Sequence, residues 1–161
     1  MDSIKSIFKI GVGPSSSHTM GPRRAAEQFL SKHPEASAFR VELYGSLAAT
    51  GKGHLTDHAI LNVLGASHTE IVWKPQVFLP FHPNAMRFYT LDSAGQPQNE
   101  WEVYSIGGGF LSEGKSGGSQ EPAIAYPYTT MDGILGWYAK TGRIFWEYVL
   151  EYEGQPVFDH L

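Results

Sequence analysis

The chain has 161 residues, of which 42% are hydrophobic and 17% are charged, and its formal net charge is −4. This length and composition suit one compact domain or two small ones with an apolar core, and they exclude a largely disordered chain. The mild acidity and the scattered Lys and Arg residues argue against nucleic acid or a membrane surface as a partner, and no apolar stretch is long enough to cross a bilayer.

The sequence contains no cysteine. Disulfides, a cysteine nucleophile and any zinc or iron–sulfur site with cysteine ligands are therefore excluded within this chain. Residues 1–10 carry Asp2, Lys5 and Lys9 and lack the apolar core of a secretory signal. We therefore expect a cytoplasmic protein.

The first distinctive segment, residues 11–22, reads GVGPSSSHTMGP and encloses three serines, a histidine and a threonine between Gly-Pro breakers. Pro22 suits the first turn of a helix, where its missing N–H has no cost. The hydroxyls and His18 are then expected to gather at a helix N-terminus, which attracts carboxylates and phosphates. The same segment could also be only a serine-rich helix entry with one exposed histidine.

Alternating apolar residues next predict a strand at 39–43, followed by a glycine-rich turn at 44–54. Thr56 is expected to cap a helix that stops at Gly65. Further strands are predicted at 69–73, 76–79, 86–91 and 100–106. A Gly/Ser-rich loop is expected at 114–122, and helices from Met131 onward with a possible break at Gly142.

The later strands follow one another with no helix between them. This order favours an α+β sandwich, in which a mixed, largely antiparallel sheet has helices packed on one side, over a doubly wound fold.

Common nucleotide and metal motifs fit the sequence poorly. The run Gly11-Val12-Gly13 lacks the third glycine of a dinucleotide fingerprint, and Gly51-Lys52-Gly53 lacks the spacing of a phosphate-binding loop. His54 and His58 are four residues apart, as zinc ligands can be, but Leu55 stands where a metalloprotease helix has its glutamate. We expect no metal ligands in this chain.

His54 is the sharpest candidate for chemistry, because it stands in a glycine-flanked turn beside Lys52, and imidazole suits proton abstraction near neutral pH. An isolated loop histidine is nevertheless more often an ordinary surface residue. A Ser17–His54–Asp57 triad could also be assembled, although no Gly-x-Ser-x-Gly elbow exists.

Two further segments complete the set of candidates. His82, between an aromatic residue and a proline, is interpreted as a packed structural residue. Gly107–Gly109 has no side chains, so its functional use would be close approach of backbone to a ligand, and its structural alternative is a β-bulge.

Taken together, these segments resemble the β domain of iron–sulfur-dependent L-serine dehydratases, also called L-serine ammonia-lyases. The matching stretches are Ile10–Pro22, Gly45–Ala48, Thr50–His54 with Thr56-Asp57, His82–Asn84 with Met86–Phe88, and Gly107–Phe110. They occur in the family's order and cover most of the chain up to about residue 150.

The resemblance implies conversion of L-serine to pyruvate and ammonia without pyridoxal phosphate (PLP). It also implies a [4Fe–4S] cluster held by cysteines of a separate α domain, so this chain would be inactive alone. The expected partners are that α domain or subunit, L-serine, and further copies in a homo-oligomer. Residues 1–150 would form the β domain and residues 151–161 an extension or linker. The expected fold resembles the allosteric substrate-binding domain of some phosphoglycerate dehydrogenases.

By the same resemblance, His54 is the candidate base and His18 the second acid/base or orienting residue. The implied substrate-binding residues are Ser15, Ser16, Ser17, Thr19, Lys52, Asn84, Gly107, Gly108 and Gly109. Two other interpretations stay open: a module that only binds a small carboxylate effector or docks a partner, and a hydrolase that uses Ser17.

Overall fold

The computed structural model describes residues 3–4, 11, 13–114 and 126–154. They belong to two compact units, one made of residues 11–119 and the other of residues 1–10 and 120–161. Of the predicted Gly/Ser-rich loop only Gly114 is described, and of the predicted extension only residues 151–154. The domain boundary expected at residue 150 lies inside a helix and stays a prediction.

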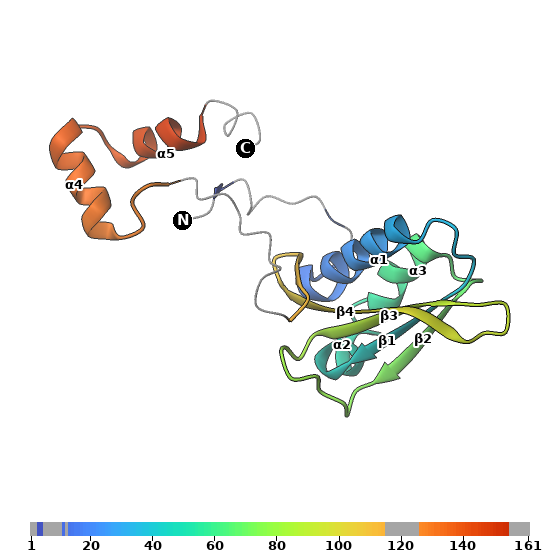
Figure 1. Cartoon of the computed structure of the whole chain (residues 1–161). Helices are drawn as coiled ribbons and strands as arrows, with labels where there is room; N and C mark the ends of the chain where they lie inside the picture. Colours follow the sequence, from blue (N-terminus) through green and yellow to red (C-terminus); the bar gives the residue numbers. More distant parts are fainter. Residues whose placement is uncertain (1–2, 5–10, 12, 115–125, 155–161) are drawn as a thin grey trace. The chain divides into compact units, whose positions relative to one another are not determined.

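The larger unit is built on a five-stranded sheet with the order β2-β1-β3-β4-β5 (Figure 1). The strands are β1 (Phe39–Tyr44), β2 (Thr69–Lys74), β3 (Ala85–Leu91), β4 (Pro97–Gly107) and β5 (Phe110–Ser112). The β1–β2 pair is parallel, and the other three pairs are antiparallel. This mixed, largely antiparallel sheet with its helices confirms the predicted α+β class.

Four helical elements accompany this sheet: η2 (Ser16–Met20), α1 (Gly21–Lys32), α2 (Gly45–Thr50) and α3 (Thr56–Leu64). The first is a single turn of π-helix that leads directly into α1. Helices α1 and α3 lie over the same face of the sheet (Figure 1).

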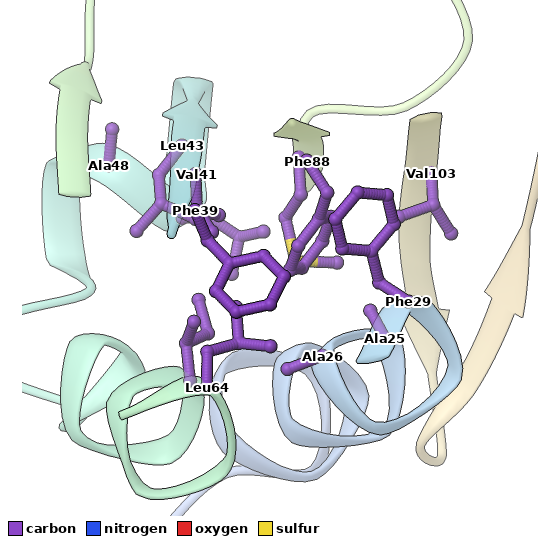
Figure 2. Close-up of a cluster of buried hydrophobic side chains, with 13 residues drawn as sticks. Ala25, Ala26, Phe29, Phe39, Val41, Leu43, Ala48, Leu64, Phe88 and Val103 are labelled. Carbon is purple, nitrogen blue, oxygen red and sulfur yellow. The ribbon is translucent and has the colours of Figure 1, made fainter. Parts of the chain in front are cut away.

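The core of this unit forms where alternating strand residues meet the helices (Figure 2). Phe39, Val41 and Leu43 alternate along β1 and are all buried, as the period of two requires. Phe29 of α1 is fully buried, and its ring lies 5.4 Å from the Phe88 ring of β3 in a tilted arrangement. Burial of such side chains removes several hundred Å² of apolar surface from water and supplies most of the driving force for this packing.

The opposite face of the sheet is polar and aromatic. Arg87 lies in its centre and pairs with Glu102 at 2.7 Å. Tyr104 is buried on this face and donates to Glu102, and burial together with this bond raises its pKa to about 12. The Phe81 ring packs on Tyr104 at 5.1 Å, so the β2–β3 connection covers part of this face.

The smaller unit contains α4 (Met131–Thr141) and α5 (Phe145–Glu153). Gly142 adopts a left-handed conformation with φ 69° and ends α4, which confirms the predicted break. Glu153 is nearly buried and accepts hydrogen bonds from the Ser3 hydroxyl at 2.6 Å and the Ile4 N–H at 2.7 Å. Ser3 and Ile4 are thereby tied to the second helix of this unit.

Three expectations about local structure were wrong. Residues 76–79 form no strand. The Val77 carbonyl instead accepts a hydrogen bond from the Gly45 N–H, the first N–H of α2. The stretch predicted as a turn from 44 contains α2, a helix too short to leave a clear period in the sequence. Thr56 is not a cap: it begins α3, and Leu55 precedes it with φ 60°.

Within the described part of the chain, no helix combines the length and apolar character needed to span a membrane.

Candidate active site

The serine-rich segment forms the π-helical turn η2, and its own hydroxyls hold it together. The Ser15 hydroxyl accepts the His18 N–H at 3.2 Å and caps the turn. Thr19 is buried, and its hydroxyl donates to the Ser15 carbonyl. Ser16 is exposed, whereas the Ser17 hydroxyl lies 2.9 Å from Nδ1 of His18.

His18 is held from several elements at once. Besides its contact with Ser17, its Nε2 lies 3.4 Å from the Ser46 hydroxyl at the start of α2. Its carbonyl accepts a 2.7 Å bond from the buried hydroxyl of Thr56 in α3. Burial lowers the pKa of His18 below its ordinary value, the neighbouring His54 lowers it further, and a hydrogen bond involving Ser46 opposes the shift. At neutral pH this imidazole is therefore uncharged.

His54 lies beside His18, with a ring centroid separation of 4.8 Å. Its Nδ1 is 3.0 Å from the carbonyl oxygen of Thr50 at the end of α2. A carbonyl only accepts hydrogen bonds, so Nδ1 must carry the proton. The neutral ring then has Nε2 as its unprotonated nitrogen, which is the atom able to take a proton.

The turn that carries His54 is built by backbone bonds across the glycines. The Thr56 N–H donates to the Gly51 carbonyl at 2.9 Å, and the His54 N–H lies 3.1 Å from the same oxygen. Leu55, in a left-handed conformation, follows the histidine and directly precedes α3. Lys52 is exposed in this turn, and its Nζ lies 5.6 Å from the centre of the Trp73 ring.

Asn84 is connected to the π-helical turn η2 through Ser105 of β4. The Ser105 N–H donates to the Asn84 carbonyl at 2.9 Å, and Asn84 Nδ2 donates to the Ser105 carbonyl at 3.4 Å. The Ser105 hydroxyl donates to the Ser17 carbonyl at 2.8 Å. Gly107, Gly108 and Gly109 all have positive φ, and the Gly109 carbonyl accepts from Arg24 of α1 at 3.4 Å.

The structure thus links four of the candidate residues, Asn84, Ser17, His18 and His54, in a continuous series of contacts. From Asn84 the series runs through Ser105 and Ser17 to His18 and His54. Lys52 joins it only as a member of the His54 turn. His82 is half-buried and its Nδ1 accepts the Asn84 N–H at 3.1 Å, which agrees with its interpretation as a structural residue.

The alternative catalytic triad is not assembled. Ser17 is hydrogen bonded to His18, and Nδ1 of His54 faces a carbonyl instead of a carboxylate. The Asp57 carboxylate accepts the His58 N–H at the start of α3. The geometry therefore gives no support to a hydrolase that uses Ser17 with His54.

Four residues of the site escaped the sequence analysis: Ser46, Thr50, Thr56 and Ser105. Ser46 and Thr56 stand inside recognised segments, but only the fold shows that their hydroxyls turn toward His18. Thr50 contributes a backbone carbonyl, which any residue carries. The only available signal for Ser105 was its position two residues before the glycine run.

Comparison with known proteins points to one family. A sequence model of the serine dehydratase beta chain family matches residues 3–70 and 62–116. An L-serine dehydratase of Mycobacterium bovis is 35% identical over a match covering 83% of this chain and 38% of that protein. An L-serine dehydratase of Streptomyces coelicolor is 31% identical, with coverages of 94% and 43%. L-serine dehydratase 1 of Escherichia coli is 28% identical, with coverages of 88% and 41%.

The chain therefore spans less than half the length of these relatives, from 38% to 43%. The family model covers the whole histidine site, including the serine turn, His54, Asn84 and the glycine run. The chain belongs to the serine dehydratase beta chain family.

Proposed function

We propose that this chain is the β part of an L-serine dehydratase, a lyase that converts L-serine to pyruvate and ammonia. The proposal rests on the His18–His54 pair, and above all on the tautomer of His54. The Thr50 carbonyl fixes the proton on Nδ1 and leaves Nε2 as the basic nitrogen. A module that only bound a carboxylate would have no use for a base prepared in this way.

The reaction requires a proton to be taken from the α-carbon of serine and the β-hydroxyl to leave as water. The aminoacrylate formed by this elimination then hydrolyses to pyruvate and ammonia. His54 Nε2 accepts the α-proton in this scheme. A neutral His18 beside it does not repel the positive charge that His54 acquires, and its hydrogen bonds to Ser17 and Ser46 keep its ring in place.

The substrate carboxylate is assigned to the surroundings of the serine turn. Ser15, Ser16 and Ser17 supply hydroxyl and backbone donors, with Lys52 as the nearby positive charge. Asn84 and the backbone of Gly107–Gly109 complete the binding residues. The Thr19 hydroxyl is already bonded inside the turn, so its contribution is to hold the shape of the turn.

The chain's own residues cannot provide cysteine ligands for an iron–sulfur cluster, since it contains none. Among the described residues, no group of three His, Asp or Glu side chains could hold a metal ion either. The proposed [4Fe–4S] cluster therefore belongs to a cysteine-bearing α domain or subunit. When bound there, it would supply a Lewis acid that assists departure of the hydroxyl group. No PLP is required.

The test is anaerobic pyruvate release from L-serine, measured for this chain alone and for its mixture with the cysteine-bearing part carrying a reconstituted cluster. We expect turnover only in the mixture. If a mixture with a spectroscopically intact cluster releases no pyruvate, the proposal fails. Serine binding to the chain without turnover would then favour the carboxylate-binding module.

A further inference from the structure

One carbonyl in the π-helical turn η2 is left without a backbone donor by the sequence itself. In this turn the Gly21 N–H donates to the Ser16 carbonyl, five residues back. The next bond of the same register would join the N–H of residue 22 to the Ser17 carbonyl. Residue 22 is proline and has no N–H, so this bond cannot form.

The hydroxyl of Ser105 takes the place of the missing donor. It lies on β4, 88 residues away in sequence, and donates to the Ser17 carbonyl at 2.8 Å. Ser105 is fully buried, and its N–H is bonded to the Asn84 carbonyl, so the strand holds the residue rigidly. A Cβ at Gly21 would overlap the Ser105 hydroxyl, so the first residue of α1 leaves room for this bond.

The position of this bond bears directly on His18. Ser17 precedes His18, and its hydroxyl contacts the His18 ring at 2.9 Å. The next carbonyl along the chain, that of His18, is held by the buried Thr56 hydroxyl. Two consecutive peptide groups are therefore fixed by hydroxyls from different elements, Ser105 of β4 on one side and Thr56 of α3 on the other.

We propose that Ser105 is a positioning residue for His18: by replacing the donor that Pro22 lacks, it sets the orientation of the Ser17–His18 pair toward His54. Its relevance to turnover rests on the proposed dehydratase function, whereas its effect on His18 does not. Loss of this bond would leave the carbonyl of the half-buried Ser17 without this donor, and a carbonyl shielded from water without a donor is unfavourable. The turn would then rearrange to recover a partner and would carry the His18 ring with it.

The decisive experiment compares Ser105→Ala, Pro22→Ala and the double variant in the full-length chain. The readout is the ring nitrogen signals of the histidines in ¹⁵N NMR, which report tautomer and hydrogen bonding. We expect Ser105→Ala to shift the His18 signals, and those of His33 and His68 to stay unchanged. Pro22→Ala alone is expected to have little effect. The double variant is expected to restore the His18 signals, because residue 22 then carries an N–H for the Ser17 carbonyl.

Thr90→Val is the matched control, since it removes another buried strand hydroxyl, which accepts from Asn99. It is expected to leave the His18 signals unchanged. Unaltered His18 signals in Ser105→Ala would overturn the proposal. Failure of Pro22→Ala to restore them, or loss of folding in both the single and double variants, would show that Ser105 acts through general packing and would also overturn it.

In the mixture that releases pyruvate, Ser105→Ala is expected to lower kcat about 10- to 100-fold, the range expected when a group at the site is misplaced by about 1 Å. The double variant is expected to recover most of this loss. Absence of pyruvate from the wild-type mixture would instead refute the proposed function, and the NMR comparison on the chain alone would still decide the role of Ser105.

Discussion

The two imidazoles of the site lie close enough for His54 to affect the charge of His18. His18 lies in a more enclosed environment, and burial together with the neighbouring ring lowers its pKa. His54 is oriented by a carbonyl that fixes its tautomer. This difference in surroundings assigns different roles to two residues of the same type, with His54 as the proposed base and His18 as its neutral neighbour.

His54→Ala is expected to reduce kcat in the complemented enzyme about 10²–10⁴-fold, because it removes the nitrogen proposed to take the α-proton. The control is His58→Ala, which removes an exposed histidine on the next turn and is expected to keep full turnover. Steady-state pyruvate release measures both. Near-normal turnover by His54→Ala would remove this residue from the role of base.

The lowered pKa of His18 also leads to a prediction about the stability of the chain. Because its pKa is lower in the folded chain than the ordinary value of about 6.5, the unfolded chain binds the proton more readily. The associated stability is complete above that ordinary value and is lost as the pH falls through the lowered folded value. Urea unfolding between about pH 8 and 5 should show a fall in stability that is smaller in His18→Gln. Equal falls in both proteins would contradict this assignment.

Short elements position the site. The π-helical turn η2 brings its carbonyls within reach of side chains from β4 and α3, and α2 ends so that the Thr50 carbonyl meets His54. The turn after α2 packs tightly: at Gly51, a Cβ would overlap the Leu47 carbonyl oxygen and approach Trp73 at 2.8 Å. The geometry of His54 therefore depends on a residue without a side chain at this point.

Gly51→Ala is expected to destabilise the sheet unit by ~1–3 kcal/mol, as overpacking generally does, and to disturb the contact between the two histidines. Gly136→Ala in α4 is the control, because a Cβ there meets nothing within 4 Å and an alanine in a helix interior is favoured by up to ~1 kcal/mol. Urea unfolding measures both changes. An unchanged free energy of unfolding in Gly51→Ala would show that the turn can relax to accept the methyl group.

The whole molecule consists of two units with separate cores. The sheet unit contains every candidate site residue, whereas the helical unit gathers Tyr126, Ile134, Trp137 and Tyr148 around the α4–α5 pair. Its Glu153 is held by Ser3 and Ile4. We therefore expect that the stability of each unit can be changed separately.

Glu153→Ala is expected to cost the helical unit ~1–3 kcal/mol, because it leaves the Ser3 hydroxyl and the Ile4 N–H without their acceptor. The sheet unit is expected to keep its stability. Hydrogen exchange resolved by residue separates the two effects. Equal loss of protection in β1 and α5 would show that the units unfold together.

Much of the secondary structure was predictable because it depends on local pattern. The alternation of Phe39, Val41 and Leu43 predicted β1, and Gly142 marked the break between α4 and α5. The segment 76–79 was predicted wrongly because it is largely apolar, yet its Val77 carbonyl accepts a hydrogen bond from the first N–H of α2 instead of joining a strand. The hydrophobicity pattern of a segment does not indicate the direction of its backbone carbonyls.

By itself, the sequence determined the α+β class, the resemblance to the serine dehydratase family and the histidines placed at the centre of the site. These depend on residue types, their order and their local spacing, which are present in the linear chain. Only the tertiary structure decided that His18 and His54 lie 4.8 Å apart, that Thr50 sets the tautomer of His54, and that Ser105 satisfies the carbonyl left open by Pro22. These depend on backbone groups and on contacts between residues up to 88 positions apart, and packing alone brings such groups together.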